Sequence, residues 1–181
     1  MIKKFAAIAP FAIVIALIFR SQIETKIEAI DKTSTPGDSR LCRVKPGSIY
    51  DGDTLRVICD REELRIRLCG IDAPEKAQAG GIESRDHLRS LVARGGGEII
   101  VMPVESDRYG RTVAELFVPI GEEIHLNTQM ILDGYAWHYA QYSKNCPNFF
   151  AIEEAEAIAK SNGNYIQGQP PWEYRKTGKS Q

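Results

Sequence analysis

An Asp-Gly pair at residues 51–52 separates two short apolar runs and limits how the first folded part of the chain can be built. Such a pair is the strongest short-range signal of a β-hairpin, because glycine accepts the positive φ of a tight turn. We therefore predict strands over residues 41–49 and 54–59, joined by this turn. A charged turn at residues 60–63 and a third strand over residues 64–69 would extend the hairpin into a three-stranded meander.

The rest of the pattern predicts a small mixed fold. Leu88, Leu91 and Val92 are spaced as on one helix face, and glycines at 95–97 would end that helix. The other strands and helices are expected at residues 98–105, 112–118, 126–133 and 148–161. Five short strands with a helix after the third are typical of an OB-fold. The predicted class is therefore α+β, mainly β: a five-stranded OB-fold barrel with about three helices, preceded by an N-terminal hydrophobic leader.

The leader has the pattern of an export signal. Two lysines at positions 3 and 4 precede an apolar run over residues 5–19, which only Pro10 interrupts. The run is long for a cleaved signal and shorter than the about 20 residues of a spanning helix. No clear Ala-x-Ala site follows it, so a cleaved signal peptide and a retained signal anchor both stay open.

The chain is thus predicted to have four parts. They are a signal peptide or anchor at 1–20, a flexible tether at 21–40, the OB-fold domain at 41–168 and a C-terminal tail at 169–181. The tail is expected to be a strand-like cover that packs Trp172 on the barrel. The protein is expected outside the cytosol, secreted or periplasmic, with residues 5–19 in the inner membrane if they are retained.

Four cysteines in an exported chain favour a disulfide, because thiols oxidise outside the cytosol. Cys42 and Cys59 lie at similar distances from the Asp-Gly turn, at the open end of the predicted hairpin, so we predict a bond between them. Cys69 is interpreted as a small buried apolar residue, and Cys146 has no clear partner. The spacing of cysteines and histidines does not support a zinc site.

The net charge of -1 gives no general basic field for nucleic acid, so any phosphate binding must be local. Three acidic residues, Asp53, Asp72 and Glu75, gather at two predicted turns. Carboxylates this close raise one another's pKa, and a divalent cation removes their repulsion. Because the proline after Ala73 holds that residue extended, its carbonyl is kept out of any helix. We predict a hard-oxygen cation site made by Asp53, Asp72 and the Ala73 carbonyl.

Arginines and tyrosines beside these carboxylates suggest phosphate and base binding. Arg67 and Arg111 could each be a solvated surface charge, but two guanidinium groups at one site are suited to bidentate binding of phosphate oxygens. Arg108, Tyr109 and Tyr142 are candidate substrate contacts, since aromatic rings stack on bases without regard to sequence. The tyrosines could also be core residues, and the three histidines show no spacing of a triad or a metal cluster.

Three ordered segments of the chain resemble the staphylococcal-nuclease-like, or thermonuclease, family. They are Asp-Gly-Asp-Thr at 51–54, Arg-Leu-Cys-Gly-Ile-Asp-Ala-Pro-Glu at 67–75 and Asp-Arg-Tyr-Gly-Arg at 107–111. Each segment alone is a weak signal, whereas the ordered set is specific, and the resemblance extends over residues 42–166. The best-known member has threonine in place of Ala73, an exchange that a backbone ligand should tolerate.

The resemblance implies a calcium-dependent, sugar-nonspecific endonuclease that acts on DNA and RNA, prefers single strands and leaves 3′-phosphate ends. It implies that Asp53 and Asp72 hold Ca²⁺ and that Glu75 orients or deprotonates the attacking water. Arg67 and Arg111 would stabilise the charge of the transition state. The protein is expected to be a monomer.

Two other functions stay open from the sequence. One is a catalytically silent OB-fold module, tethered to the membrane, that binds nucleic acid or a protein. The other is a structural or adhesive domain that uses calcium for rigidity. The presence of every expected carboxylate and arginine argues against a silent domain.

Overall fold

The computed structural model describes residues 39–177, which lie within one compact unit. The predicted leader and nearly all of the predicted tether fall outside the described residues, as do residues 178–181. Within the described part, no helix is both long enough and apolar enough to cross a membrane.

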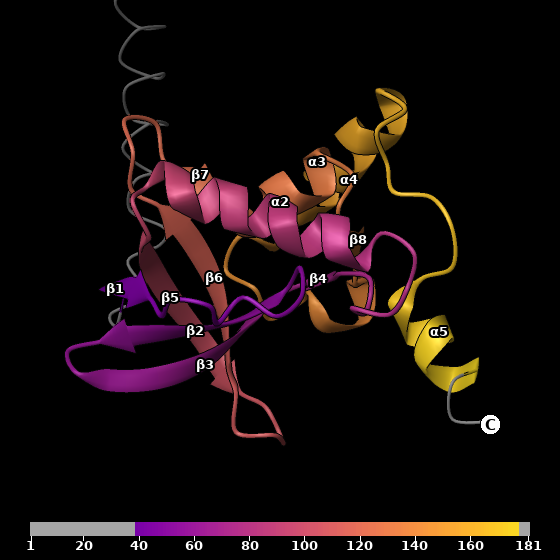
Figure 1. Cartoon of the computed structure of the whole chain (residues 1–181). Coiled ribbons are helices and arrows are strands. Elements are labelled where there is room, and N and C mark those ends of the chain that lie inside the picture. Colours follow the sequence, from indigo (N-terminus) through magenta and orange to yellow (C-terminus); the bar gives the residue numbers. More distant parts are fainter. Residues whose placement is uncertain (1–38, 178–181) are drawn as a thin grey trace, which may run out of the picture. The chain divides into compact units, whose positions relative to one another are not determined.

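Five strands form the predicted barrel (Figure 1). They are β1 (Arg40–Val44), β2 (Thr54–Cys59), β3 (Glu62–Leu68), β5 (Glu98–Ser106) and β6 (Thr112–Val118). Their order is β3-β2-β1-β5-β6, and a parallel pairing of β3 with β6 closes the sheet. The short β7 (Ile124–His125) pairs with β6, and β4 (Ile71–Asp72) pairs separately with β8 (Trp137–His138). The predicted OB-fold-type architecture is confirmed.

The described chain also contains four α-helices and a short 3₁₀ helix. They are α2 (Gly81–Arg94), α3 (Leu126–Leu132), η1 (Ala140–Tyr142), α4 (Phe149–Ser161) and α5 (Pro171–Thr177). In Figure 1, α2, α3 and α4 gather in one group, whereas a long connection leads to α5. The strand-like tail predicted here is wrong, because Pro171 takes the first helical position, where a missing N–H costs nothing.

The connection between β1 and β2 differs from the predicted tight turn. Residues 45–53 join the two strands, and Gly52 does not have a positive φ. Glycine is needed there for space, because a Cβ atom would collide with the Ser84 side chain. The tight turn instead joins β2 to β3, where Asp60 and Arg61 have φ values of 49° and 77°.

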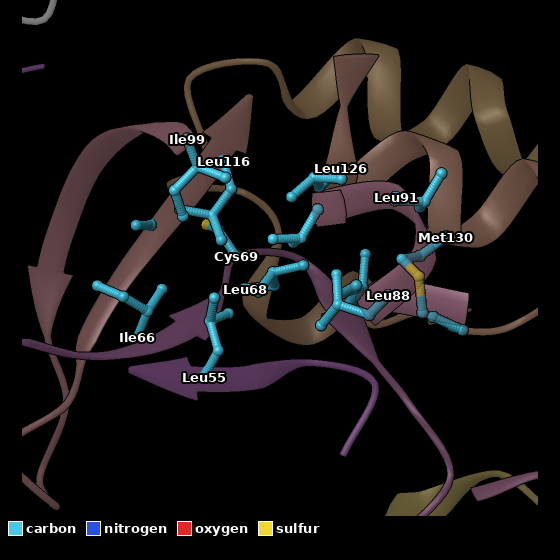
Figure 2. Packing of buried hydrophobic residues seen from close by; sticks show 14 of the residues in the cluster. Leu55, Ile66, Leu68, Cys69, Leu88, Leu91, Ile99, Leu116, Leu126 and Met130 are labelled. Atoms are coloured by element: carbon cyan, nitrogen blue, oxygen red, sulfur yellow. The ribbon is translucent and has the colours of Figure 1, made fainter. Parts of the chain in front are cut away.

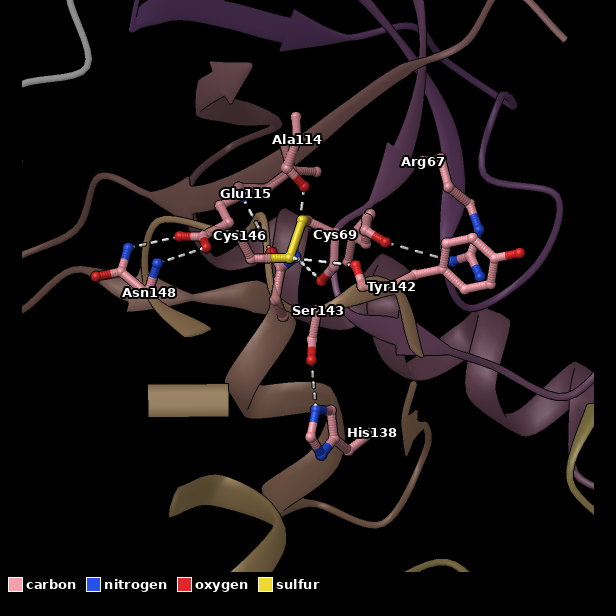
Figure 3. Close-up of a disulfide and its surroundings, with 12 residues drawn as sticks. Arg67, Cys69, Ala114, Glu115, His138, Tyr142, Ser143, Cys146 and Asn148 are labelled. Atoms are coloured by element: carbon pink, nitrogen blue, oxygen red, sulfur yellow. Dashed lines mark hydrogen bonds between the residues drawn. A yellow bond between two sulfur atoms is a disulfide. The ribbon is translucent and has the colours of Figure 1, made fainter. Parts of the chain in front are cut away.

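Two disulfides use the four cysteines. Cys42 is bonded to Cys59 across β1 and β2, the pair that the hairpin register predicts. Cys69 is bonded to Cys146, 77 residues away, so the interpretation of Cys69 as a mere apolar residue is wrong (Figure 3). This second bond ties the end of β3 to the segment before α4.

The core lies between the barrel and the helices (Figure 2). Leu55 and Ile66 of the barrel and Leu88 and Met130 of the helices have no exposed surface. Each such side chain contributes roughly 1.5–3 kcal/mol on burial, so this packing holds the strand ends firmly. Side chains alternate along β3, so Arg67 points away from the core that holds Ile66.

Candidate active site

The three motif segments meet at one cavity of about 620 Å³. Nine residues predicted from the sequence line it together: Asp53, Arg67, Asp72, Ala73, Glu75, Arg108, Tyr109, Arg111 and Tyr142. The cavity has a buried half rich in carboxylates and a more exposed half on the loop between β5 and β6. The fold therefore gathers every proposed catalytic, metal-binding and substrate-binding residue at one place.

The buried half begins with a turn stabilised by Asp51. Its Oδ1 accepts hydrogen bonds from the backbone N–H groups of Asp53 and Thr54, at 3.1 and 2.6 Å. Burial raises the pKa of the Asp51 carboxyl to about 7, and the neighbouring charge of Asp53 adds to the shift. The Asp53 side chain itself accepts the Ala73 N–H at 2.7 Å, which fixes the Ala73 peptide beside it.

Arg67 lies between the two predicted metal ligands. Its Nη1 is 2.8 Å from Asp53 Oδ2, and its Nη2 is 2.8 Å from Asp72 Oδ1. All three side chains are largely buried, with exposed fractions of 14% for Arg67, 9% for Asp53 and 1% for Asp72. Because buried charges are stable only when paired, the three groups form one interdependent cluster.

Asp72 and Glu75 share a second arginine. Burial raises the pKa of Asp72, while Arg175 and Arg67 act in the opposite direction. Glu75 is more exposed than Asp72 and lies on the loop that follows β4, where its Oε1 is 2.7 Å from Nη1 of Arg175. Arg175, which comes from α5 in the tail segment, was not predicted as a site residue from the sequence.

The donors of the buried half suit a hard cation. In the described range of the chain, no three side chains of His, Cys, Asp or Glu are gathered closely enough to form a complete metal cluster. Asp53 and Asp72, however, contact the same guanidinium, so one small cation could also reach both. Two carboxylates with waters in the other positions make an oxygen-only donor set of the kind calcium prefers.

The exposed half of the cavity is one self-contained loop. The carboxylate of Asp107 accepts the backbone N–H groups of Tyr109 and Arg111, each at 2.9 Å, and the Nε–H of Arg111 at 2.7 Å. Burial alone would raise the pKa of Asp107, but these hydrogen bonds outweigh it and lower the pKa. Gly110, with a φ of 70°, allows the loop to turn back.

Aromatic rings stand at the rim of the cavity. The guanidinium groups of Arg108 and Arg111 lie 4.8 and 5.5 Å from the Tyr109 ring, and Tyr109 is 59% exposed. Tyr142, at the end of η1, is 58% exposed, so neither tyrosine is a core residue. Tyr139, a third tyrosine whose role as a stacking or a core residue the sequence left open, also lines the cavity.

The segment that carries Tyr142 is stabilised by a disulfide and by hydrogen bonds. In Figure 3 the Cys69–Cys146 bond lies beside Ser143, whose hydroxyl is 2.8 Å from His138 Nε2. His138 Nδ1 is 2.7 Å from Glu156 of α4. The three residues Ser143, His138 and Glu156 are of the types found in a hydrolytic triad. Ser143 has no exposed surface, however, so this hydrogen-bonded arrangement stabilises the fold.

Comparison with known proteins relates the chain to nucleases. Residues 65–166 match the family described as "Staphylococcal nuclease homologue". The chain is 35% identical over 140 residues to a protein named micrococcal nuclease from Shigella flexneri, covering 73% of this chain and 79% of the relative. It is 38% identical over 129 residues to a protein named "Uncharacterized endonuclease" from Escherichia coli O157:H7, covering 70% and 80%. A protein named ParB from Escherichia coli is 34% identical over 137 residues, with coverages of 71% and 76%.

Proposed function

The chain belongs to the family of staphylococcal nuclease homologues and is a phosphodiester-hydrolysing nuclease, and we propose that it is a calcium-dependent endonuclease for both DNA and RNA. One observation carries this proposal. Asp53 and Asp72 share a guanidinium in the buried half of a cavity whose other half presents Arg111 and Tyr109. Carboxylates for a cation and arginines for a phosphate thus line the same 620 Å³ space.

Asp53 and Asp72, with the Ala73 carbonyl and waters, would hold the cation. A bound calcium ion would polarise the scissile phosphate and offset the negative charge of the carboxylates. The donors are preorganised for this, because the Ala73 N–H fixes the Asp53 carboxylate and the strand pairing of Asp72 with Trp137 fixes the Asp72 backbone. The backbone of the site therefore needs little rearrangement when the cation enters.

Glu75 would act on the water. As the most exposed of the three carboxylates, it can orient a water molecule for attack on phosphorus and accept its proton. The bond from phosphorus to the 5′ oxygen then breaks, and the leaving oxygen takes up a proton from solvent. The products are a 3′-phosphate end and a 5′-hydroxyl end.

Arg67 and Arg111 would bind the reacting phosphate from the buried and the exposed half of the cavity, respectively. Their forked guanidinium groups match the phosphate oxygens, whose negative charge increases in the transition state. In the structure both are held by carboxylates, Arg67 by Asp53 and Asp72 and Arg111 by Asp107. These ion pairs orient the two arginines before substrate arrives.

The exposed tyrosines at the rim of the cavity would favour unpaired nucleotides. Tyr109 and Tyr142 are exposed, and aromatic faces stack on any base that is free of its partner strand. Arg108 lies beside Tyr109 and can contact a neighbouring phosphate. These features support a preference for single-stranded DNA and RNA without sequence specificity.

We further propose that the protein acts outside the cytosol as a monomer, secreted or periplasmic, with residues 5–19 as a membrane anchor if they are retained. The two disulfides support export, because cytosolic thiols are kept reduced.

Cleavage of labelled oligonucleotides by the purified full-length chain tests the proposed function. We expect hydrolysis of single-stranded DNA and RNA with calcium, none with excess chelator, and products whose 3′ ends a polymerase extends only after phosphatase treatment. Asp72→Asn should abolish cleavage, whereas Glu122→Gln, an equivalent change at an exposed loop position, should not. Full activity in chelator would exclude the cation mechanism, and 3′-hydroxyl products would exclude the proposed bond.

A further inference from the structure

The last helix of the described chain inserts an arginine into the buried half of the cavity. Arg175 of α5 binds Asp72 with two nitrogens, Nη1 to Oδ1 at 3.2 Å and Nη2 to Oδ2 at 2.7 Å. Its Nη1 also lies 2.7 Å from Oε1 of Glu75. A single guanidinium therefore occupies both the proposed cation ligand Asp72 and the proposed water-activating Glu75.

The segment around Arg175 is anchored beside the cavity. The ring of Trp172 stacks on Tyr139, with 5.0 Å between centroids and an angle of 5° between planes. The side-chain amide of Gln78 donates a hydrogen bond to the Gln169 carbonyl, and Pro171 is buried. These contacts hold α5 beside the cavity, so the effective concentration of Arg175 at Asp72 and Glu75 is high.

The two arginines at Asp72 differ in how easily they can leave. Arg67 is 14% exposed and pairs with two buried carboxylates. Arg175 is 39% exposed, and Glu75, one of its two partners, is equally exposed. Asp72 is only 1% exposed, but Arg175 is more open to solvent than Arg67, so the Arg175 contacts are the ones that a divalent cation can replace more easily.

We propose that α5 is a built-in competitor of the catalytic cation. In the cation-free protein Arg175 occupies Asp72 and Glu75 and keeps them from binding calcium and water. When calcium binds Asp72, the guanidinium is displaced and Glu75 is released. This inference rests on the proposed cation site at Asp53 and Asp72, and it adds that residues 169–177 set the calcium affinity of that site.

Calcium titration calorimetry of the full-length chain, without substrate, tests the competition. Arg175→Gln should bind calcium about tenfold more tightly than the wild type, as expected if the arginine-free form is about one tenth of the wild-type population. The matched control is Lys176→Gln, which removes the same charge from an exposed position of the same helix. We expect its affinity to stay within about twofold of the wild type.

A second variant acts on the anchor and leaves Arg175 in place. Trp172→Ala removes the stacking on Tyr139 and should tighten calcium binding by a smaller factor than Arg175→Gln. Equal or weaker calcium binding by Arg175→Gln would overturn the competition while leaving the proposed function intact. Failure of all variants and the wild type to bind calcium would overturn both the competition and the proposed cation site.

Discussion

The two halves of the cavity are built in different ways. The carboxylate half joins residues far apart in the sequence, since Asp53 binds Ala73 at a separation of 20 residues and Asp72 binds Arg175 at a separation of 103. The loop half is complete within five residues, where Asp107 holds Arg111 at a separation of four. We conclude that the first half depends on the whole fold, whereas the second depends only on its own turn.

The largest expected effects come from removing one arginine from each half. Arg67→Ala and Arg111→Ala should each lower turnover by at least about a hundredfold, because each loses a transition-state contact. Only Arg67→Ala should also lower the free energy of unfolding, by about 3–5 kcal/mol without calcium, since it leaves the buried Asp53 without an ion-pair partner and Asp72 with Arg175 alone. Arg111→Ala should change that free energy by less than about 1 kcal/mol.

Measured kcat and urea unfolding of the two variants separate catalytic from structural roles. Lysine at either position should restore little turnover, because an ammonium group cannot bind two phosphate oxygens as a fork. Near-full turnover of Arg67→Lys or Arg111→Lys would show that the residue does not clamp the phosphate. Equal loss of stability in both alanine variants would contradict the difference between the halves.

The disulfides give the next largest effect. Replacing Cys69 and Cys146 by serine should lower the free energy of unfolding by about 4.5 kcal/mol, against about 3 kcal/mol for Cys42 and Cys59. The difference follows from the loops they close, with sequence separations of 77 and 17. Replacing Cys69 and Cys146 should also lower turnover more than replacing the other pair, because their bond stabilises the segment that carries Tyr142. Thermal unfolding and kcat of the two double variants measure both effects, and a larger loss of stability from the Cys42 and Cys59 pair would reverse this ranking.

The smallest expected effect belongs to the rim of the loop half. Tyr109→Ala should raise the dissociation constant for a single-stranded oligonucleotide about tenfold, the value of one lost base-stacking contact. The protein should be as stable as the wild type, because the Tyr109 ring is largely exposed. Tyr50→Ala, at another exposed tyrosine, is the control and should not change binding. Unchanged binding by Tyr109→Ala would remove the stacking role.

The same contrast explains what the sequence could predict. The bounds of β2 and β6 agree with the predicted strands, and Asp107 to Arg111 forms a loop as expected, because these features depend on local pattern. The tight turn predicted at the Asp-Gly pair is wrong. Gly52 leaves space for the Ser84 side chain of α2, and the local sequence pattern does not show where that helix packs. The partners of Cys69 and Asp72 could not be predicted, because Cys146 and Arg175 reach them only through the folded chain.

A crystal structure with calcium and a bound mononucleotide tests the central claim most directly. We predict a calcium ion about 2.3–2.6 Å from oxygens of Asp53 and Asp72, with the phosphate between Arg67 and Arg111. Calcium bound elsewhere, with the phosphate outside the cavity, would contradict the claim that the carboxylate half is the catalytic cation site.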